Sequence, residues 1–151
     1  MATPFYKKIY TARDIATTTK ATWVTAIVFD ITVDFPPECL ADSGGTFFHF
    51  DILDVFKDNT GLATDGTGRH NSAWFHAAII RVTGGVLTGG YTVDEVSRAG
   101  NDFGTLGDNQ VRLLPSSVGL SDTITIQVES PTGNNDGVHF VVAEVTAYND
   151  A

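Results

Sequence analysis

The stretch that decides the fold reads Ser121-Asp-Thr-Ile-Thr-Ile-Gln-Val-Glu129, followed after eight residues by Val138-His-Phe-Val-Val-Ala-Glu-Val-Thr-Ala-Tyr148. In the first segment, branched apolar residues alternate with polar ones, which predicts a strand with one apolar face. The second segment is apolar at nearly every position, which predicts a strand covered on both faces. The Pro, Gly, Asn and Asp residues between them are typical of a turn. Together the two segments predict a C-terminal hairpin at the core of a two-layer β protein.

The same alternation predicts further strands upstream. The run Trp23–Val33 places Trp23, Ile27, Phe29, Ile31 and Val33 on one face, and it ends at two prolines, which cannot donate to a β-ladder. In the run Thr46–Phe56, Phe48, Phe50 and Ile52 share one face, and Phe47, His49 and Asp51 share the other. The remaining predicted strands are Ala73–Val82, Val86–Leu87, Tyr91–Val96 and Gln110–Leu114.

No segment repeats apolar residues with a helical period over three turns. Seven to nine strands, at the spacing of about 8–12 residues found in all-β folds, predict an antiparallel β-sandwich of jelly-roll-like type. The 151 residues suit a single domain. We expect the sandwich to span residues 23–151.

Residues 1–22 differ from the rest, because their apolar residues are sparse and irregular. One interpretation is an edge strand or loop on the outside of the sandwich. The other is an extended arm that docks onto a neighbouring subunit and offers basic residues to an acidic partner. The candidate partner-binding residues of this arm are Phe5, Tyr6, Lys7, Lys8, Tyr10 and Arg13.

The charge of the chain argues against nucleic acid as a partner. Nine basic and 18 acidic residues give a formal net charge of −9, which repels phosphate backbones. No apolar run approaches the roughly 20 residues that cross a bilayer, and the first residues lack the apolar segment of a secretory signal. The single Cys39 excludes an internal disulfide and a cysteine zinc cluster, and we expect a buried, inert thiol.

Catalytic motifs are missing from the sequence, so we expect neither an enzyme nor a bound cofactor. There is no Gly-x-Ser-x-Gly elbow and no phosphate-binding loop. His49-Phe50-Asp51 has the local spacing of metal sites in β-barrel enzymes, with His76 or His139 as a distant ligand. This spacing occurs often by chance, and we expect the imidazoles to pair with neighbouring carboxylates and to bind no metal.

Aromatic residues provide the alternative function. Trp23, Trp74, Tyr91 and Tyr148 are candidates for a platform on which a sugar ring stacks, with Trp74 and Tyr91 the strongest. Both tryptophans lie in predicted strands among apolar neighbours, so a place in the core is the competing interpretation.

Residues 74–148 resemble a recurring β-sandwich pattern in the virion proteins of tailed bacteriophages. Its parts are a strand with an aromatic residue and an Arg before a Gly-Gly turn (Trp74-Phe-His-Ala-Ala-Ile-Ile-Arg-Val-Thr-Gly-Gly85), an alternating Ile/Val strand (Ser121–Glu129) and a last strand with Ala143-Glu-Val145. The resemblance implies no catalytic residues.

It implies a structural virion component, such as a capsid decoration or cement protein that binds the major capsid protein or other virion proteins. By analogy we expect a homo-oligomer, a trimer, located in the virion and in the host cytoplasm before assembly. The alternative is a carbohydrate-binding receptor-recognition module of a phage tail or fibre.

Overall fold

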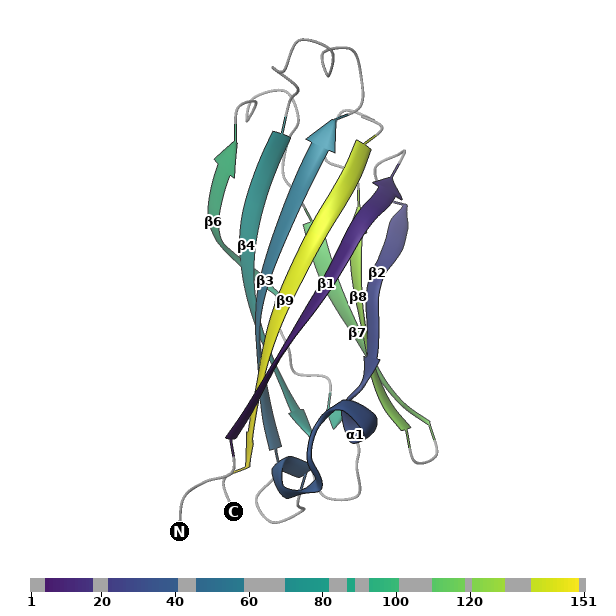
Figure 1. Ribbon diagram of the computed structural model, residues 1–151, viewed down its shortest axis with the longest axis vertical. Coiled ribbons are helices and arrows are strands. Elements are labelled where there is room, and N and C mark those ends of the chain that lie inside the picture. Colours follow the sequence, from purple (N-terminus) through teal and green to yellow (C-terminus); the bar gives the residue numbers. More distant parts are fainter. Residues whose placement is uncertain are drawn as a thin grey trace.

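The computed structural model describes residues 5–17, 22–40, 46–58, 70–81, 87–88, 93–100, 110–118, 121–129 and 137–149. Within them the chain forms two antiparallel sheets that pack face to face as a β-sandwich (Figure 1). The predicted class, an all-β antiparallel sandwich in a single domain, is confirmed.

The larger sheet has six strands. Its order is β1 (Phe5–Thr17), β9 (Gly137–Asn149), β3 (Thr46–Asp58) and β4 (His70–Arg81), with β5 (Leu87–Thr88) and β6 (Asp94–Gly100) both paired to β4. The smaller sheet has the order β2 (Trp23–Asp30), β8 (Ser121–Glu129), β7 (Gln110–Val118). The pairing is nested, because β1 pairs with β9 in one sheet while β2 pairs with β8 in the other. Nested pairing of this kind is a feature of jelly-roll sandwiches.

The predicted C-terminal hairpin is wrong. Strand β8 pairs with β2 and β7, and β9 pairs with β1 and β3, so the chain crosses from one sheet to the other between them. The apolar faces of the two strands therefore meet across the core instead of lying side by side. The outer face of β9 is only half-buried, so the expectation that both of its faces are covered is also wrong.

The core lies between the sheets and follows the predicted alternation. Phe48, Phe50 and Ile52 of β3 are buried against Ile124 and Ile126 of β8 in one cluster. The inward positions of β9 add small and branched residues, from Val141 to Ala147, which let the two sheets approach closely. Cys39 is 2% exposed, in agreement with the expected buried thiol.

The run predicted as one strand from Trp23 to Val33 is divided. β2 ends at Asp30, whose Oδ1 accepts hydrogen bonds from Thr32 N and Thr32 Oγ1, and the short helix α1 (Ile31–Asp34) follows. A bulge between Thr25 and Ile27 shifts the register by one residue. Trp23 consequently lies on the outer face, under the guanidinium of Arg112 at 4.5 Å, while Ile27 points into the core. A 3-10 turn, η1 (Pro37–Leu40), leads on towards β3.

Of the two interpretations of the N-terminal segment, its described part is an edge strand. β1 pairs with β9 of the same chain from Phe5 to Thr17 (Figure 1). Residues 1–4 and 18–21 lie outside the described residues. No described helix is long and apolar enough to cross a membrane.

Candidate binding surface on the six-stranded sheet

The outer face of the six-stranded sheet is built by the side chains that alternate with the core. In β3 these outward residues are His49, Asp51, Leu53, Val55 and Lys57. Residues directly opposite in antiparallel strands share a face. The register therefore adds Glu144, Val142, Phe140 and Val138 from β9, and His76, Trp74 and Ser72 from β4. We call this continuous surface the outer face.

Trp74 is an exposed aromatic residue on the outer face, with 39% of its surface accessible. It lies between Leu53 of β3 and Ser97 of β6 in the register. Its neighbours on the same face of β4 are Ser72, whose hydroxyl donates to the carbonyl of Ala99, and His76. The indole thus has polar side chains on three sides and Leu53 on the fourth, on a strand that is paired on both edges.

A polar row runs beside Trp74. His76 Nε2 lies 2.7 Å from Asp51 Oδ1, and both side chains are about 60% exposed. Asp51 is opposite Glu144, which pairs with Lys7 at 2.9 Å, and His76 is opposite Asp94. This row supplies hydrogen-bonding groups next to an aromatic surface.

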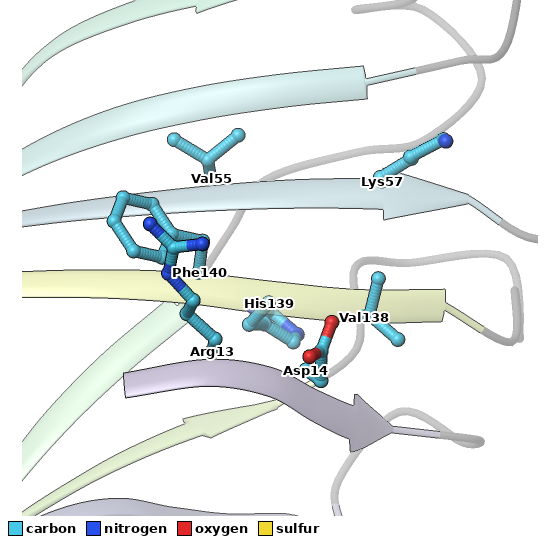
Figure 2. Close-up of a pocket in the computed structure, with 7 residues that line it drawn as sticks. All are labelled: Arg13, Asp14, Val55, Lys57, Val138, His139 and Phe140. Atoms are coloured by element: carbon cyan, nitrogen blue, oxygen red, sulfur yellow. The ribbon is translucent and has the colours of Figure 1, made fainter. Parts of the chain in front are cut away.

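An open pocket of about 380 Å³ lies where β1, β9 and β3 run side by side (Figure 2). Its lining includes Val55 and Lys57 of β3, Val138, His139 and Phe140 of β9, and Arg13 and Asp14 of β1. Figure 2 shows Arg13 lying over Phe140, and the guanidinium carbon is 5.4 Å from the ring centroid.

A bulge in β1 builds one side of this pocket. Ala12 pairs with Val141 and Ile15 pairs with His139, so Arg13 and Asp14 together oppose the single residue Phe140. Asp14 has a φ of 55°, in the left-handed region that aspartate tolerates better than most residues. Bulges re-aim side chains and are frequent beside functional sites. Here the bulge brings Arg13 and Asp14 to the pocket while Ile15 packs against the core.

A buried polar chain lies next to the pocket. His139 Nδ1 is 2.8 Å from Asp54 Oδ1, and His139 Nε2 is 3.1 Å from Thr17 Oγ1. A hydroxyl, an imidazole and a carboxylate hydrogen-bonded in this order also form the catalytic triads of enzymes that use a nucleophile. The side chains of His139 and Asp54 have no exposed surface and Thr17 is buried, so no substrate atom reaches them in this structure. These two hydrogen bonds link the side chains of β1, β9 and β3.

The candidate residues of the N-terminal segment contact their own chain. Two of the aromatic residues pack on rings of the core: Tyr6 packs on Phe35, and Tyr10 stacks on Phe29 and donates a hydrogen bond to Asp34. The two lysines form ion pairs, Lys7 with Glu144 and Lys8 with Asp34 at 3.4 Å. Arg13 lies over the ring of Phe140. The backbone of Phe5 pairs with Tyr148, and its side chain lies outside the described residues. Binding of another subunit by this segment stays a prediction.

The histidines do not gather as a metal site within the described part of the chain. His49, Asp51 and His76 lie on the outer face, whereas His139 is buried on the opposite face of the sheet with Asp54. No group of three potential ligands occurs among the described residues. Tyr91, the second candidate for the sugar platform, lies outside them.

Sequence reasoning missed the bulge pocket and the buried chain. The signal for the buried chain was present: Asp54 and His139 are polar residues at inward positions of otherwise apolar alternations. The pocket left no such signal, because it depends on the register of β1 against β9.

Comparison of the chain with models of known protein families, and with curated proteins, gives no match. Among solved structures, it is similar to the tailspike protein of Acinetobacter baumannii phage AM24, with a TM-score of 0.44 and 10% identity over 97% of this chain and 26% of that chain. It is also similar to the tailspike protein of Acinetobacter phage vB_ApiP_P1, with a TM-score of 0.31 and 14% identity over 93% of this chain and 21% of that chain. The chain thus spans about a quarter of the length of these tailspike proteins.

Proposed function

We propose that this domain is a virion binding module that recognises a carbohydrate through the outer face, with Trp74 as the stacking platform. The single observation that carries the proposal is the exposed indole of Trp74 on a rigid sheet. A pyranose ring presents a face of C–H groups, which packs on the electron-rich face of an aromatic ring. Because the ring is fixed on a strand, little conformational entropy is lost on binding.

The polar row beside Trp74 supports the same function. Sugar hydroxyls need donors and acceptors at fixed positions, and the hydrogen-bonding groups of Asp51 and His76 supply both. Ser97, opposite Trp74, and Ser72 add hydroxyl groups on the other side. The sequence resemblance of residues 74–148 to virion sandwich proteins supports a place in a phage tail or fibre, where such a surface recognises a receptor.

Binding to a glycan array, followed by calorimetry with the bound glycans, tests this function. We expect Trp74→Ala to weaken binding by roughly two- to tenfold, since stacking on an aromatic ring contributes about 0.5–1.5 kcal/mol. Trp74→Tyr keeps an aromatic face and retains most of the affinity. Trp23→Ala is the matched control, because Trp23 lies on the outer face of the other sheet. A wild-type protein that binds no glycan, or a Trp74→Ala variant that binds equally well, would refute the proposal.

A second candidate function is assembly into the capsid as a decoration or cement protein. Val28 and Leu114 are 58% and 39% exposed, and both lie opposite Thr125 on the outer face of the three-stranded sheet. Exposed apolar side chains in one row favour contact with a second copy of this chain. Light scattering at high concentration tests this function. An oligomer that the double variant Val28→Asp, Leu114→Asp converts to a monomer would support it, and a wild-type monomer would exclude it.

A further inference from the structure

Two of the cations that the structure describes, Arg13 and Lys57, border the pocket at the β1 bulge. Lys7 and Lys8 are neutralised by Glu144 and Asp34. Arg13 and Lys57 make no ion pair with any carboxylate of the described residues, and both border the pocket. In a chain of net charge −9, this places two available positive charges at one concave site.

The packing of Arg13 leaves its hydrogen-bond donors accessible. The guanidinium lies over the Phe140 ring, so one face of its plane is covered. Its N–H groups lie in that plane and point outward at the edge, in the fork geometry that matches a carboxylate. Lys57 on β3 adds a second, point-like charge at the rim of the pocket, and in Figure 2 its amine points away from Arg13.

The other lining residues narrow the class of ligand. Val55, Val138 and Phe140 are half-buried and form an apolar part of the lining, which suits C–H groups and not a fully hydrated inorganic anion. Asp14 repels a multiply charged phosphate, but its carboxylate accepts hydrogen bonds from hydroxyl groups. A carboxylate, hydroxyls and a C–H face occur together in an acidic sugar. The volume of about 380 Å³ lies in the range of small-ligand pockets.

The pocket and Trp74 lie on the same face of the six-stranded sheet. Val55 in its lining is two residues along β3 from Leu53, which is opposite Trp74. Strands lie about 4.8 Å apart, so β1 and β4 are separated by about 14 Å across three such spacings. A short oligosaccharide can therefore reach from the indole to Arg13 along one face.

We infer that this pocket binds the carboxylate-bearing residue of an acidic oligosaccharide, such as a uronic or sialic acid, while a neighbouring sugar stacks on Trp74. The inference deepens the proposed function and rests on it. Arg13 binds the carboxylate, Lys57 adds positive charge at the rim, Asp14 accepts from a hydroxyl, and Val55 and Phe140 contact the ring.

An array of acidic oligosaccharides, each paired with its carboxyl-reduced neutral counterpart, tests this inference. We expect the wild-type protein to prefer the acidic member of a pair at least about tenfold, and this preference to fall as salt is added. Arg13→Gln and Lys57→Gln should each remove most of the preference while neutral binding is kept. Arg112→Gln is the matched control, because Arg112 also lies over an aromatic ring, Trp23, but on the other sheet. Thermal unfolding of each variant verifies that it is folded.

The outcomes separate this inference from the proposed function. Equal binding of acidic and neutral members, lost in Trp74→Ala, overturns the acidic subsite and leaves carbohydrate recognition intact. An acidic preference that survives in both Arg13→Gln and Lys57→Gln also overturns it, as does an equal loss in Arg112→Gln. Binding to no member of the array refutes both.

Discussion

Asp54 and His139 contact each other at 2.8 Å between Oδ1 and Nδ1, and neither side chain has any exposed surface. On the other face of the same sheet, Asp51 and His76 make the same kind of pair at 2.7 Å with both side chains about 60% exposed. β3 thus contributes the aspartates of one buried and one exposed aspartate–histidine pair, three positions apart in the sequence.

We expect mutations in these two pairs to lower the free energy of unfolding by very different amounts. Asp54→Ala leaves a buried imidazole without its carboxylate, and we expect a loss of about 3–5 kcal/mol in the free energy of unfolding. Asp51→Ala, the matched control, breaks an exposed pair and should cost no more than about 1 kcal/mol. Urea unfolding at pH 7 measures both. Similar losses in the two variants would contradict a structural role for the buried pair.

Tyr10 predicts a pH dependence at the alkaline end. Burial raises the pKa of Tyr10, and its hydrogen bond to Asp34 raises this pKa further. The folded state therefore retains the phenolic proton above about pH 10, where the unfolded chain releases it. The stabilising contribution is complete below that pH and is lost as the pH rises. The free energy of unfolding should fall as the pH rises above about 10, the ordinary pKa of tyrosine. Tyr10→Phe should make this fall shallower. An identical slope in the variant would show that Tyr10 does not cause it.

Position 137, at the start of β9, leaves no room for a side chain. A Cβ atom at this position would meet the carbonyl oxygen of Lys57 and the ring of Phe56, both in β3. Neither the strand backbone nor a buried ring moves away easily. We expect Gly137→Ala to lower the free energy of unfolding by about 1–3 kcal/mol, as overpacked cores do. A chemical denaturation midpoint equal to that of the wild type would contradict this close packing.

Cys39 predicts slow thiol chemistry. Burial raises the pKa of the thiol, with a smaller contribution from the negative charge of Glu38. Only the thiolate reacts, so the burial of Cys39 and its raised pKa both slow the reaction of the native protein. A thiol-reactive disulfide at pH 8 should react at least about 100-fold more slowly with the native protein than in urea, because reaction requires opening of the structure. Equal rates would show that η1 opens freely.

The sequence predicts most strands of this fold but not their partners. Alternation in β3 and β8 correctly identifies Phe48, Phe50, Ile124 and Ile126 as core residues. The same alternation results whether two strands lie side by side or meet face to face across the core. The hairpin prediction failed for this reason. Helix α1 was missed because Ile31 and Val33 continue an apolar alternation that the cap at Asp30 interrupts.

The candidate site was predictable where it depends on one residue and not where it depends on register. Trp74 was named as a large aromatic residue, and only the structure shows that it lies on the outward side of β4. Arg13 was named for its charge alone. Its place over Phe140 follows from a bulge that no local pattern indicates, since bulges depend on the partner strand.

The pairing of β1 with β9 also determines when the domain can form. Phe5 is opposite Tyr148, so the contact joins positions almost at the two limits of the described residues. During synthesis β1 has no partner until residues 137–149 have left the ribosome, and contacts of such long sequence separation form slowly. Until then the edge of β1 is open to pairing with other nascent chains. Slow synthesis or crowded polysomes should therefore lower the yield of folded protein more for this domain than for a helical one of the same length.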